Sequence, residues 1–214
     1  MEKEISKATL KRLPTYLAYL KSMPADAAVN ISATALASGL SMGEVQVRKD
    51  LALVSDGGRP KIGYNREHLI ADIESFLGYG NTNDAVIIGA GKLGRALLGY
   101  GGFAEYGLNV VAAFDANDAL IGTTNGGKPI LHISRLGEFC RREKIKIGII
   151  TVPADYAQQV CDLLIENGIM AVWNFAPKHL VVPDSILVQN ENMAASLALL
   201  CKHLNDKMHG DDEE

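Results

Sequence analysis

Three glycines stand at a spacing that can hold a phosphate group. In the stretch VIIGAGKLGRALL, Gly89, Gly91 and Gly94 form a G-x-G-x-x-G pattern directly after an apolar run. Gly89 permits a tight turn, Gly91 lets the backbone approach a pyrophosphate, and Gly94 lets a helix pack closely on a strand. Free N–H groups at the start of that helix would donate to the phosphates. The pattern predicts a dinucleotide-binding loop, whose other members are Ala90, Lys92 and Leu93.

An acidic residue follows this loop at the distance that a dinucleotide site requires. Asp115 closes the apolar stretch LNVVAAFD, 21 residues after Gly94. Its carboxylate would accept hydrogen bonds from a ribose 2′-hydroxyl and would repel a 2′-phosphate. We therefore expect NAD(H), rather than NADP(H), as the cofactor.

The elements around the loop alternate in the way typical of a parallel sheet. Apolar runs interleaved with helical patterns indicate strands that helices bury on both faces. We expect strands at 85–90, 108–115, 146–153 and 169–176, helices at 92–100 and 155–168, and a last helix from about 190 to 208. The predicted fold class is α/β, with a Rossmann-like sheet. The last helix carries an apolar stripe that must bury against another surface: Met193, Leu197, Leu200, Leu204 and Met208.

The residues before this sheet are helical in pattern. Ser6 can cap a first helix, and Pro14 would kink that helix or delay its start. Ser32 can cap a second helix that runs to Ser38, with Gly39 in the left-handed turn after it. These signals predict a small helical domain ahead of the nucleotide-binding one.

A third helix completes a helix-turn-helix candidate. Ser41 and Glu44 have the spacing of a capping box that would open this helix, and two short helices joined by a glycine-containing turn form the motif. One face is apolar, with Val47, Leu51 and Val54. The opposite side offers long donors that can reach DNA bases and phosphates, namely Gln46, Arg48 and Lys49. A basic face on a protein-binding domain is the alternative.

The stretch SDGGRPKIGY predicts a basic hairpin after the third helix. Gly57 and Gly58 would form its turn, and Arg59 and Lys61 would project toward a minor groove or the DNA backbone. Helices followed by such a hairpin describe a winged-helix domain.

Charge is distributed unevenly along the 214 residues, whose net charge is −4. Residues 1–70 carry ten Lys and Arg against seven Asp and Glu, a net +3, and the rest carry eleven against eighteen, a net −7. A cationic head on an acidic body fits a head that meets a polyanion.

The cysteines and the hydropathy pattern bear on the compartment. Cys140, Cys161 and Cys201 are odd in number and lie in apolar surroundings, so we expect buried, reduced thiols. The sequence contains neither a signal-peptide pattern nor an apolar run long enough to span a membrane. We expect a cytoplasmic protein without a membrane or metal partner.

The sequence offers little machinery for a dehydrogenase. Such an enzyme needs a proton donor or acceptor held near the nicotinamide. His132 and His179 have no evident acidic partner in the sequence, and the other three histidines lie in the head or at the last helix: His68, His203 and His209. Only 29 residues follow VVPDS. We therefore expect a protein that binds the cofactor and is not an enzyme.

Several blocks along the chain, read together, resemble one bacterial family. KRLPTYLAYLK, QVRKDL, GGRPKIGY, GAGKLGRAL, AFD, GIITVPA and GIMAVWNFAP resemble, in that order, the redox-sensing transcriptional repressors called Rex. The resemblance implies a homodimer with winged-helix heads, Rossmann bodies and a C-terminal helix swapped onto the partner subunit. It also implies binding to an AT-rich pseudo-palindromic operator, with release when NADH binds.

The resemblance assigns further site residues. It implies that Asn174, Phe175 and Ala176 lie near the nicotinamide and that Tyr100 and Phe103 lie beside the pocket. It also implies cofactor contacts at the crevice where the strand order reverses, from Thr151, Val152 and Pro153. The DNA-binding set matches the recognition helix and the wing, and Lys11 and Arg12 of the first helix complete it.

Two positions depart from the family's pattern. An Arg on the first helix and an Asp at the start of the swapped helix form a charged contact in relatives, but Ala18 and Asn192 stand there in this sequence. DNA release would then rest on packing, with Met193 facing the nicotinamide, or the response to NADH would be weaker or different. Losing both charges leaves no buried charge unpaired.

The predicted organisation has three parts and leaves three rival functions open. We expect a winged-helix domain at 1–78, an NAD(H)-binding domain at 79–186, and the swapped helix with an acidic tail at 187–214. The rivals are an NAD-dependent oxidoreductase, a CoA-binding regulator, and a protein-interaction module that does not bind DNA.

Overall fold

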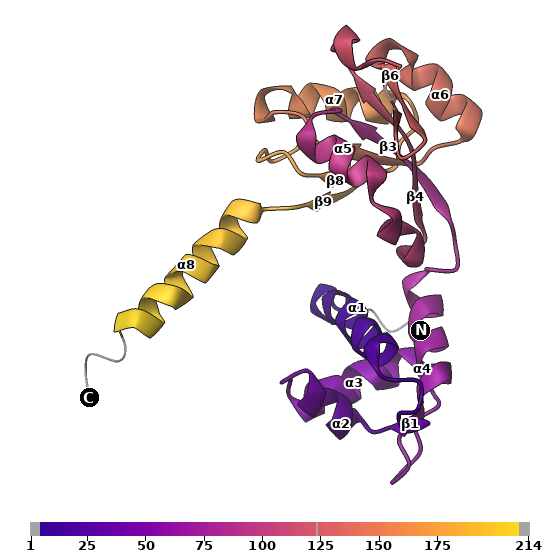
Figure 1. The fold of residues 1–214 in the computed structure, drawn as a ribbon, viewed down its shortest axis with the longest axis vertical. Helices are drawn as coiled ribbons and strands as arrows, with labels where there is room; N and C mark the ends of the chain where they lie inside the picture. Colours follow the sequence, from indigo (N-terminus) through magenta and orange to yellow (C-terminus); the bar gives the residue numbers. More distant parts are fainter. Residues whose placement is uncertain (1–4, 123, 210–214) are drawn as a thin grey trace. The chain divides into compact units, whose positions relative to one another are not determined.

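The computed structural model describes residues 5–122 and 124–209, so the tail at 210–214 lies outside the described residues. The chain divides into two compact units, one ending at Asn81 and the other beginning at Thr82. Figure 1 shows the helical first unit and the sheet of the second.

In residues 5–81, the described part of the first unit, the chain forms four helices and a two-stranded sheet. The helices are α1 (Lys7–Ser22), α2 (Ala33–Gly39), α3 (Glu44–Val54) and α4 (Arg66–Leu77), and β1 (Asn30–Ile31) pairs antiparallel with β2 (Tyr64–Asn65). The predicted caps of the first two helices are confirmed, because Ser6 accepts from the amide of Thr9 and Ser32 from that of Ala35. Pro14 lies inside α1, so it does not delay the helix.

The predicted turn between α2 and α3 is wrong in detail. Gly39 lies within α2, and the left-handed residue is Ser41, with φ of 53°. Helix α3 begins at Glu44 after Gly43, without a side-chain cap, so the predicted capping box is absent. Gly39 serves close packing, because a Cβ there would overlap the hydroxyl of Tyr19.

The wing turns at a different place from the one predicted. Arg59 and Gly63 exchange backbone hydrogen bonds of 2.9 Å, so the turn comprises Pro60, Lys61 and Ile62 rather than Gly57 and Gly58. Gly63 has φ of 86°, and a Cβ there would meet the carbonyl oxygen of Ile31. A tight backbone approach, which only glycine allows, therefore fixes the hairpin on β1.

The second unit is built on one sheet, with the order β5-β6-β4-β3-β7-β8-β9. Its strands are β3 (Asn83–Ile88), β4 (Leu108–Asp115), β5 (Thr124–Asn125), β6 (Lys128–His132), β7 (Ile147–Ile150), β8 (Ala171–Asn174) and β9 (Leu187–Asn190). All neighbours pair parallel except β5 and β6. The predicted parallel sheet is thus confirmed, and β3 lies where the strand order reverses.

Helices cover both faces of this sheet. Alternate residues of β3 face opposite sides: Val86 and Ile88 pack with α6 (Leu136–Glu143) and α7 (Ala154–Glu166), whereas Ala85 and Ile87 pack with α5 (Lys92–Gly99). Short 3-10 turns at Gly101–Tyr106, Asp118–Leu120 and Ile133–Arg135 join the elements. Strands β5, β6 and β9 and helix α6 were not among the predicted elements.

The last helix, α8 (Met193–His209), buries none of its side chains in the chain taken alone. Its apolar stripe is 54–65% exposed. Cys140 and Cys161 are buried as predicted, but Cys201 lies on α8 and is exposed, so the expectation is wrong for that thiol. Among the described helices, none has the length and hydrophobicity that a membrane crossing requires.

Candidate nucleotide and nucleic-acid sites

The glycine loop has the geometry that its spacing predicts. Gly89 adopts φ of 101°, a conformation that other residues rarely tolerate. A Cβ on Gly94 would overlap the carbonyl oxygen of Gly89, so this glycine is what allows α5 to pack against the end of β3. Gly91 directly precedes α5, whose first turn supplies free amide groups.

The second glycine of the loop faces open space. A Cβ on Gly91 would have no heavy atom within 4 Å, and Gly91 lines a cavity of about 510 Å³. Pockets for small molecules and cofactors have about this volume. The cavity is bordered by Gly89, Asp115, Thr151, Val152, Pro153 and Tyr156, among others.

Three of the predicted residues follow β7, next to β3 in the sheet. The hydroxyl of Thr151 donates to the carbonyl oxygens of Ile88 and Gly89, at 3.1 and 2.7 Å. These bonds join the loop after β7 to the glycine loop, and Val152 and Pro153 line the same cavity. The cavity therefore lies at the carboxyl ends of β3 and β7, where open α/β sheets bind ligands.

Asp115 lies at the edge of this cavity, at the end of β4. One carboxylate oxygen accepts from the amide of Ala90 at 2.6 Å, and the other accepts from that of Asn117 at 2.8 Å. Each oxygen keeps a lone pair for a further donor. A vicinal diol is a matching donor, and a phosphate in its place would be repelled, so these residues fit NAD(H) better than NADP(H).

A chain of aromatic rings lies on the α5 side of the sheet. Tyr100 and Phe103 meet at 4.8 Å between ring centres, Phe103 and Trp173 at 5.6 Å, and Trp173 and Phe175 at 4.8 Å. The indole N–H of Trp173 donates to Glu191 at 2.8 Å. The predicted site residues include three of these rings but not Trp173, which is the only tryptophan of the chain.

Asn174 is buried and is held entirely by neighbouring protein groups. Its amide nitrogen donates to the carbonyl oxygens of Ala176 and Lys178 and to the side chain of Asn190, and its oxygen accepts from the amide of Ala176. Asn174 thus fixes the loop after β8, and Ala176 borders a smaller cavity of about 310 Å³. The position of Asn174, Phe175 and Ala176 beside the nicotinamide stays a prediction.

The residues predicted to meet DNA are mostly exposed. Gln46, Arg48 and Lys49 on α3, Arg59 and Lys61 on the wing, and Lys11 on α1 are all exposed. Arg48 forms an ion pair with Glu44 one turn earlier, which a phosphate could replace at little cost because exposed pairs are weak. The exposed face of α3 also carries Val45.

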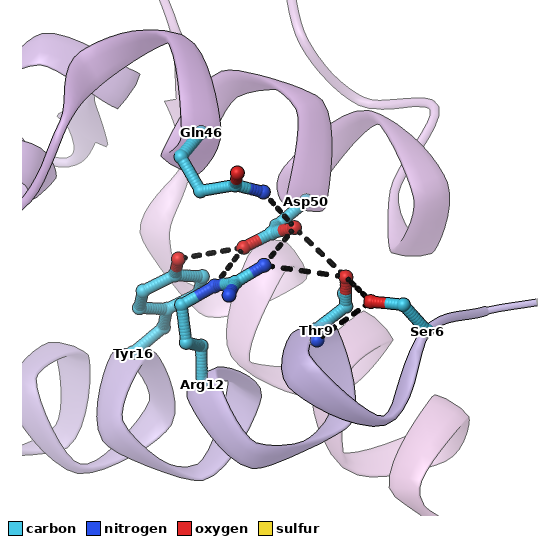
Figure 2. A network of polar contacts seen from close by, with 6 residues as sticks. All are labelled: Ser6, Thr9, Arg12, Tyr16, Gln46 and Asp50. Atoms are coloured by element: carbon cyan, nitrogen blue, oxygen red, sulfur yellow. Dashed lines mark hydrogen bonds and ion pairs between the residues drawn. The ribbon is translucent and has the colours of Figure 1, made fainter.

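Arg12 is the exception, because it is held by a buried carboxylate. Asp50, on α3, is 1% exposed, and Arg12 donates to its two oxygens through Nε at 2.7 Å and Nη2 at 3.0 Å. Figure 2 shows that Thr9, Tyr16 and Gln46 surround the same carboxylate. Arg12 therefore joins α1 to α3. The sequence did not predict this structural role of Arg12, because its partner Asp50 lies 38 residues away.

This network determines the ionisation of its members. Burial alone would raise the pKa of Asp50, but hydrogen bonds from Arg12, Tyr16 and Gln46 outweigh it and hold the pKa below the usual value. Burial and the neighbouring carboxylate raise the pKa of Tyr16 to about 12. Asp50 is thus ionised, and Tyr16 is a donor, at neutral pH.

The two positions that lack the family's charges lie in different settings. Ala18 is an exposed residue of α1. The side chain of Asn192 accepts from the amide of Ala195 at 2.9 Å, so it caps the start of α8. In the described part of the chain, no three His, Cys, Asp or Glu side chains come together as a metal site.

The fold and the two sites define a helix-turn-helix protein that carries a Rossmann-type nucleotide pocket. Two family models match: "Putative DNA-binding protein N-terminus" over residues 4–52 and "CoA binding domain" over residues 81–178. The redox-sensing transcriptional repressor Rex of Porphyromonas gingivalis is 39% identical over 200 residues, which cover 94% of this chain and 92% of the relative. That of Treponema denticola is 40% identical over 199 residues, covering 93% and 95%.

Solved structures agree with these relatives over the same extent. The crystal structure of RSP in complex with NAD⁺ and operator DNA has a TM-score of 0.90 and 33% identity, and covers 98% of this chain and 97% of RSP. RSP in complex with NADH has a TM-score of 0.88 and 32% identity, with 99% and 100% covered. RSP is described as a Rex-family repressor. The present chain belongs to the Rex family of redox-sensing transcriptional repressors.

Proposed function

We propose that this protein is a transcriptional repressor that binds an AT-rich, pseudo-palindromic operator and releases it when NADH enters the glycine-loop cavity. One observation carries the proposal: along nearly its full length, the chain matches a repressor crystallised with operator DNA and NAD⁺ and, separately, with NADH. The exposed donors of α3 and the open position at Gly91 supply the two matching sites. Its DNA target assigns the protein to the cytoplasm.

Different residues of the second unit bind different parts of the dinucleotide. The amides at the start of α5 bind the pyrophosphate, and Asp115 accepts from the ribose of the adenosine. NADH and NAD⁺ differ by one hydride and the charge of the nicotinamide ring, so only groups near that ring can discriminate between them. We assign part of this discrimination to Tyr100, which the family resemblance puts beside the pocket and whose side chain is 54% exposed.

The apolar stripe of α8 supplies the contact between two copies of the chain. Its side chains at positions 193, 197, 200, 204 and 208 are more than half exposed, and apolar patches of this kind mark interaction sites. We assign this stripe to a homodimer in which each α8 packs on the partner subunit, as the family pattern implies. A dimer presents two α3 helices to two operator half-sites.

Release of DNA then depends on a difference in NADH affinity between two arrangements of the dimer. A ligand shifts such an equilibrium only by its differential affinity, and a change from mostly bound to mostly free takes about 5.5 kcal/mol. The absent pair at Ala18 and Asn192 cannot supply it, so we assign it to packing around Met193 and the aromatic chain.

The test is a titration of a duplex, selected from a random library, with the full-length protein alone, with NADH and with NAD⁺. NADH should weaken binding at least tenfold, and NAD⁺ should leave it within twofold. Equal affinity in all three titrations refutes redox sensing, and failure to select any duplex refutes DNA binding.

CoA is a second candidate ligand, because residues 81–178 match the CoA-binding family model. CoA carries a 3′-phosphate and no nicotinamide, whereas Asp115 favours a free ribose diol. Competition between NADH and CoA for the protein decides the matter: we expect CoA not to displace NADH at equal concentration.

A further inference from the structure

The buried carboxylate of α3 has a consequence for how the helix reads DNA. We propose that Gln46 recognises an adenine in the major groove and that Asp50 is its positioning residue, an inference that rests on the proposed DNA-binding function. Gln46 is exposed on α3, yet its amide is hydrogen-bonded to a carboxylate that is 1% exposed.

The bond between these residues fixes which end of the amide faces outward. A glutamine amide has a donating nitrogen and an accepting oxygen, whereas an ionised carboxylate only accepts. Gln46 must therefore turn its nitrogen toward Asp50, and Nε2 lies 2.9 Å from Oδ1. Figure 2 shows the amide oxygen on the side away from the carboxylate.

The side chain of Asp50 cannot rotate away from Gln46, because four other donors hold its carboxylate. Oδ1 accepts from Thr9 at 3.1 Å and from Arg12 Nη2 at 3.0 Å, and Oδ2 accepts from Arg12 Nε at 2.7 Å and from Tyr16 at 2.8 Å. Thr9 is itself tied to Ser6, the cap of α1. The carboxylate thus takes its position from α1 and imposes it on the glutamine of α3.

The group left facing outward matches one base. One amide proton goes to Asp50, which leaves the carbonyl oxygen and one N–H of Gln46. Adenine presents the complementary pair in the major groove, the N6 amine as donor and N7 as acceptor. Guanine presents two acceptors and thymine an acceptor with a methyl group, so an outward carbonyl opposes both. Cytosine presents the N4 donor alone, so it would leave the remaining N–H of Gln46 without an acceptor. A glutamine without this support would rotate and discriminate less.

The experiment selects duplexes from a random library with the full-length protein and with Gln46→Ala, and compares base preferences position by position. Gln46→Ala leaves the other four donors of Asp50 in place, so it should fold. We expect one position in each half-site where the wild type prefers an A·T pair by about fivefold to 150-fold and where Gln46→Ala shows no preference. Replacing that adenine by 2-aminopurine, which lacks the N6 amine, should weaken the wild type by the same factor and leave Gln46→Ala unchanged.

A second comparison isolates Asp50. The double variant Arg12→Met with Asp50→Leu removes the acceptor without leaving a charge unpaired. Asp50→Leu alone serves if the double variant does not fold, because the Arg12 side chain is 25% exposed and can turn toward solvent. Either should lose the adenine preference at that one position and keep the others. The matched control is Tyr16→Phe, which removes a donor to Oδ2 but keeps the bond to Gln46, and it should keep the preference even where it lowers the melting temperature.

Each result decides between the two proposals. A wild type that selects no duplex refutes DNA binding itself. Selection with identical preferences in Gln46→Ala, a Gln46-dependent position that is a G·C pair, or full affinity for 2-aminopurine overturns the adenine contact alone. An unchanged preference in the Asp50 variants overturns the positioning role.

Discussion

A bulky side chain at Gly91 should disconnect the nucleotide from DNA release without disturbing the fold. Gly91 has φ of −67° and ψ of −166°, extended backbone that any residue adopts. Its Cβ would meet no atom within 4 Å and would stand at the wall of the cavity. The variant Gly91→Phe therefore directs a ring toward the space proposed for the pyrophosphate, and its Cβ does not require any neighbouring atom to move.

The loss of affinity follows from the bonds that the ring displaces. A hydrogen bond to a charged group contributes about 1.5–3 kcal/mol. Losing two such bonds to the phosphates costs about 3–6 kcal/mol, and each 1.4 kcal/mol is a factor of ten. NADH affinity should fall by a factor of about 10² to 10⁴, while affinity for duplex DNA without nucleotide stays within twofold.

Two titrations check this prediction. Calorimetry measures NADH affinity for the wild type, for Gly91→Phe and for the control Gly80→Phe, another glycine whose Cβ would meet no atom within 4 Å. Fluorescence anisotropy of a labelled duplex measures release over the same NADH range. Unchanged NADH affinity in Gly91→Phe would show that the pyrophosphate binds elsewhere. Loss of NADH binding with normal release of DNA would show that the cavity is not the sensor.

Three further perturbations address the other parts of the molecule. Lys49→Ala removes one phosphate contact, so it should weaken DNA binding and lower the slope of log affinity against log salt concentration by about one. The NADH affinity measured by calorimetry should stay unchanged, and a parallel fall in both affinities would contradict separate sites. Leu200→Asp places a charge in the stripe of α8 and should give monomers in analytical ultracentrifugation at concentrations where the wild type is dimeric, and a variant that still sediments as a dimer would place the interface elsewhere. The pKa of Asp50 is held below its usual value, so its ionisation stabilises the folded chain above about pH 3.9, and this contribution is lost as the pH falls through the lower pKa of the folded state. The melting temperature of the wild type should therefore decline more steeply over that range than that of the double variant Arg12→Met with Asp50→Leu. Parallel curves of melting temperature against pH would contradict the assignment.

The glycine loop shows how far local spacing reaches. Gly89 and Gly94 are required by contacts within the loop itself or with the residues that follow the neighbouring strand β7, which the alternating pattern already implied. The helix caps at Ser6 and Ser32 were predictable for the same reason, because a cap bonds to an amide only three residues away. The strands at the sheet edge were harder, since β6 and β9 are short and lack a continuous apolar run.

The first unit contains contacts that local sequence spacing could not predict. Lys11 and Arg12 are adjacent basic residues with the same sequence signal, yet Lys11 is exposed and Arg12 bonds to Asp50, 38 residues later. No periodicity marks Asp50 as buried, because charged residues normally lie outside. The sequence likewise did not show that Gly39 contacts Tyr19, nor that Ser41 is the left-handed residue of the turn.

The order of residue types along this chain determined what depends on neighbours in sequence: the glycine turn before α5, the acidic residue at the end of β4, the alternation that produces a parallel sheet, and a helix with basic residues on its outer face. The tertiary structure decided what depends on contacts between distant residues: that Gly91 opens into a cavity, that Arg12 belongs to a buried network, and that Gln46 is held by its amide nitrogen. The division has a physical cause. Turns and caps are closed by bonds across a few residues, whereas the partner of a buried charge is set only when separate helices pack together.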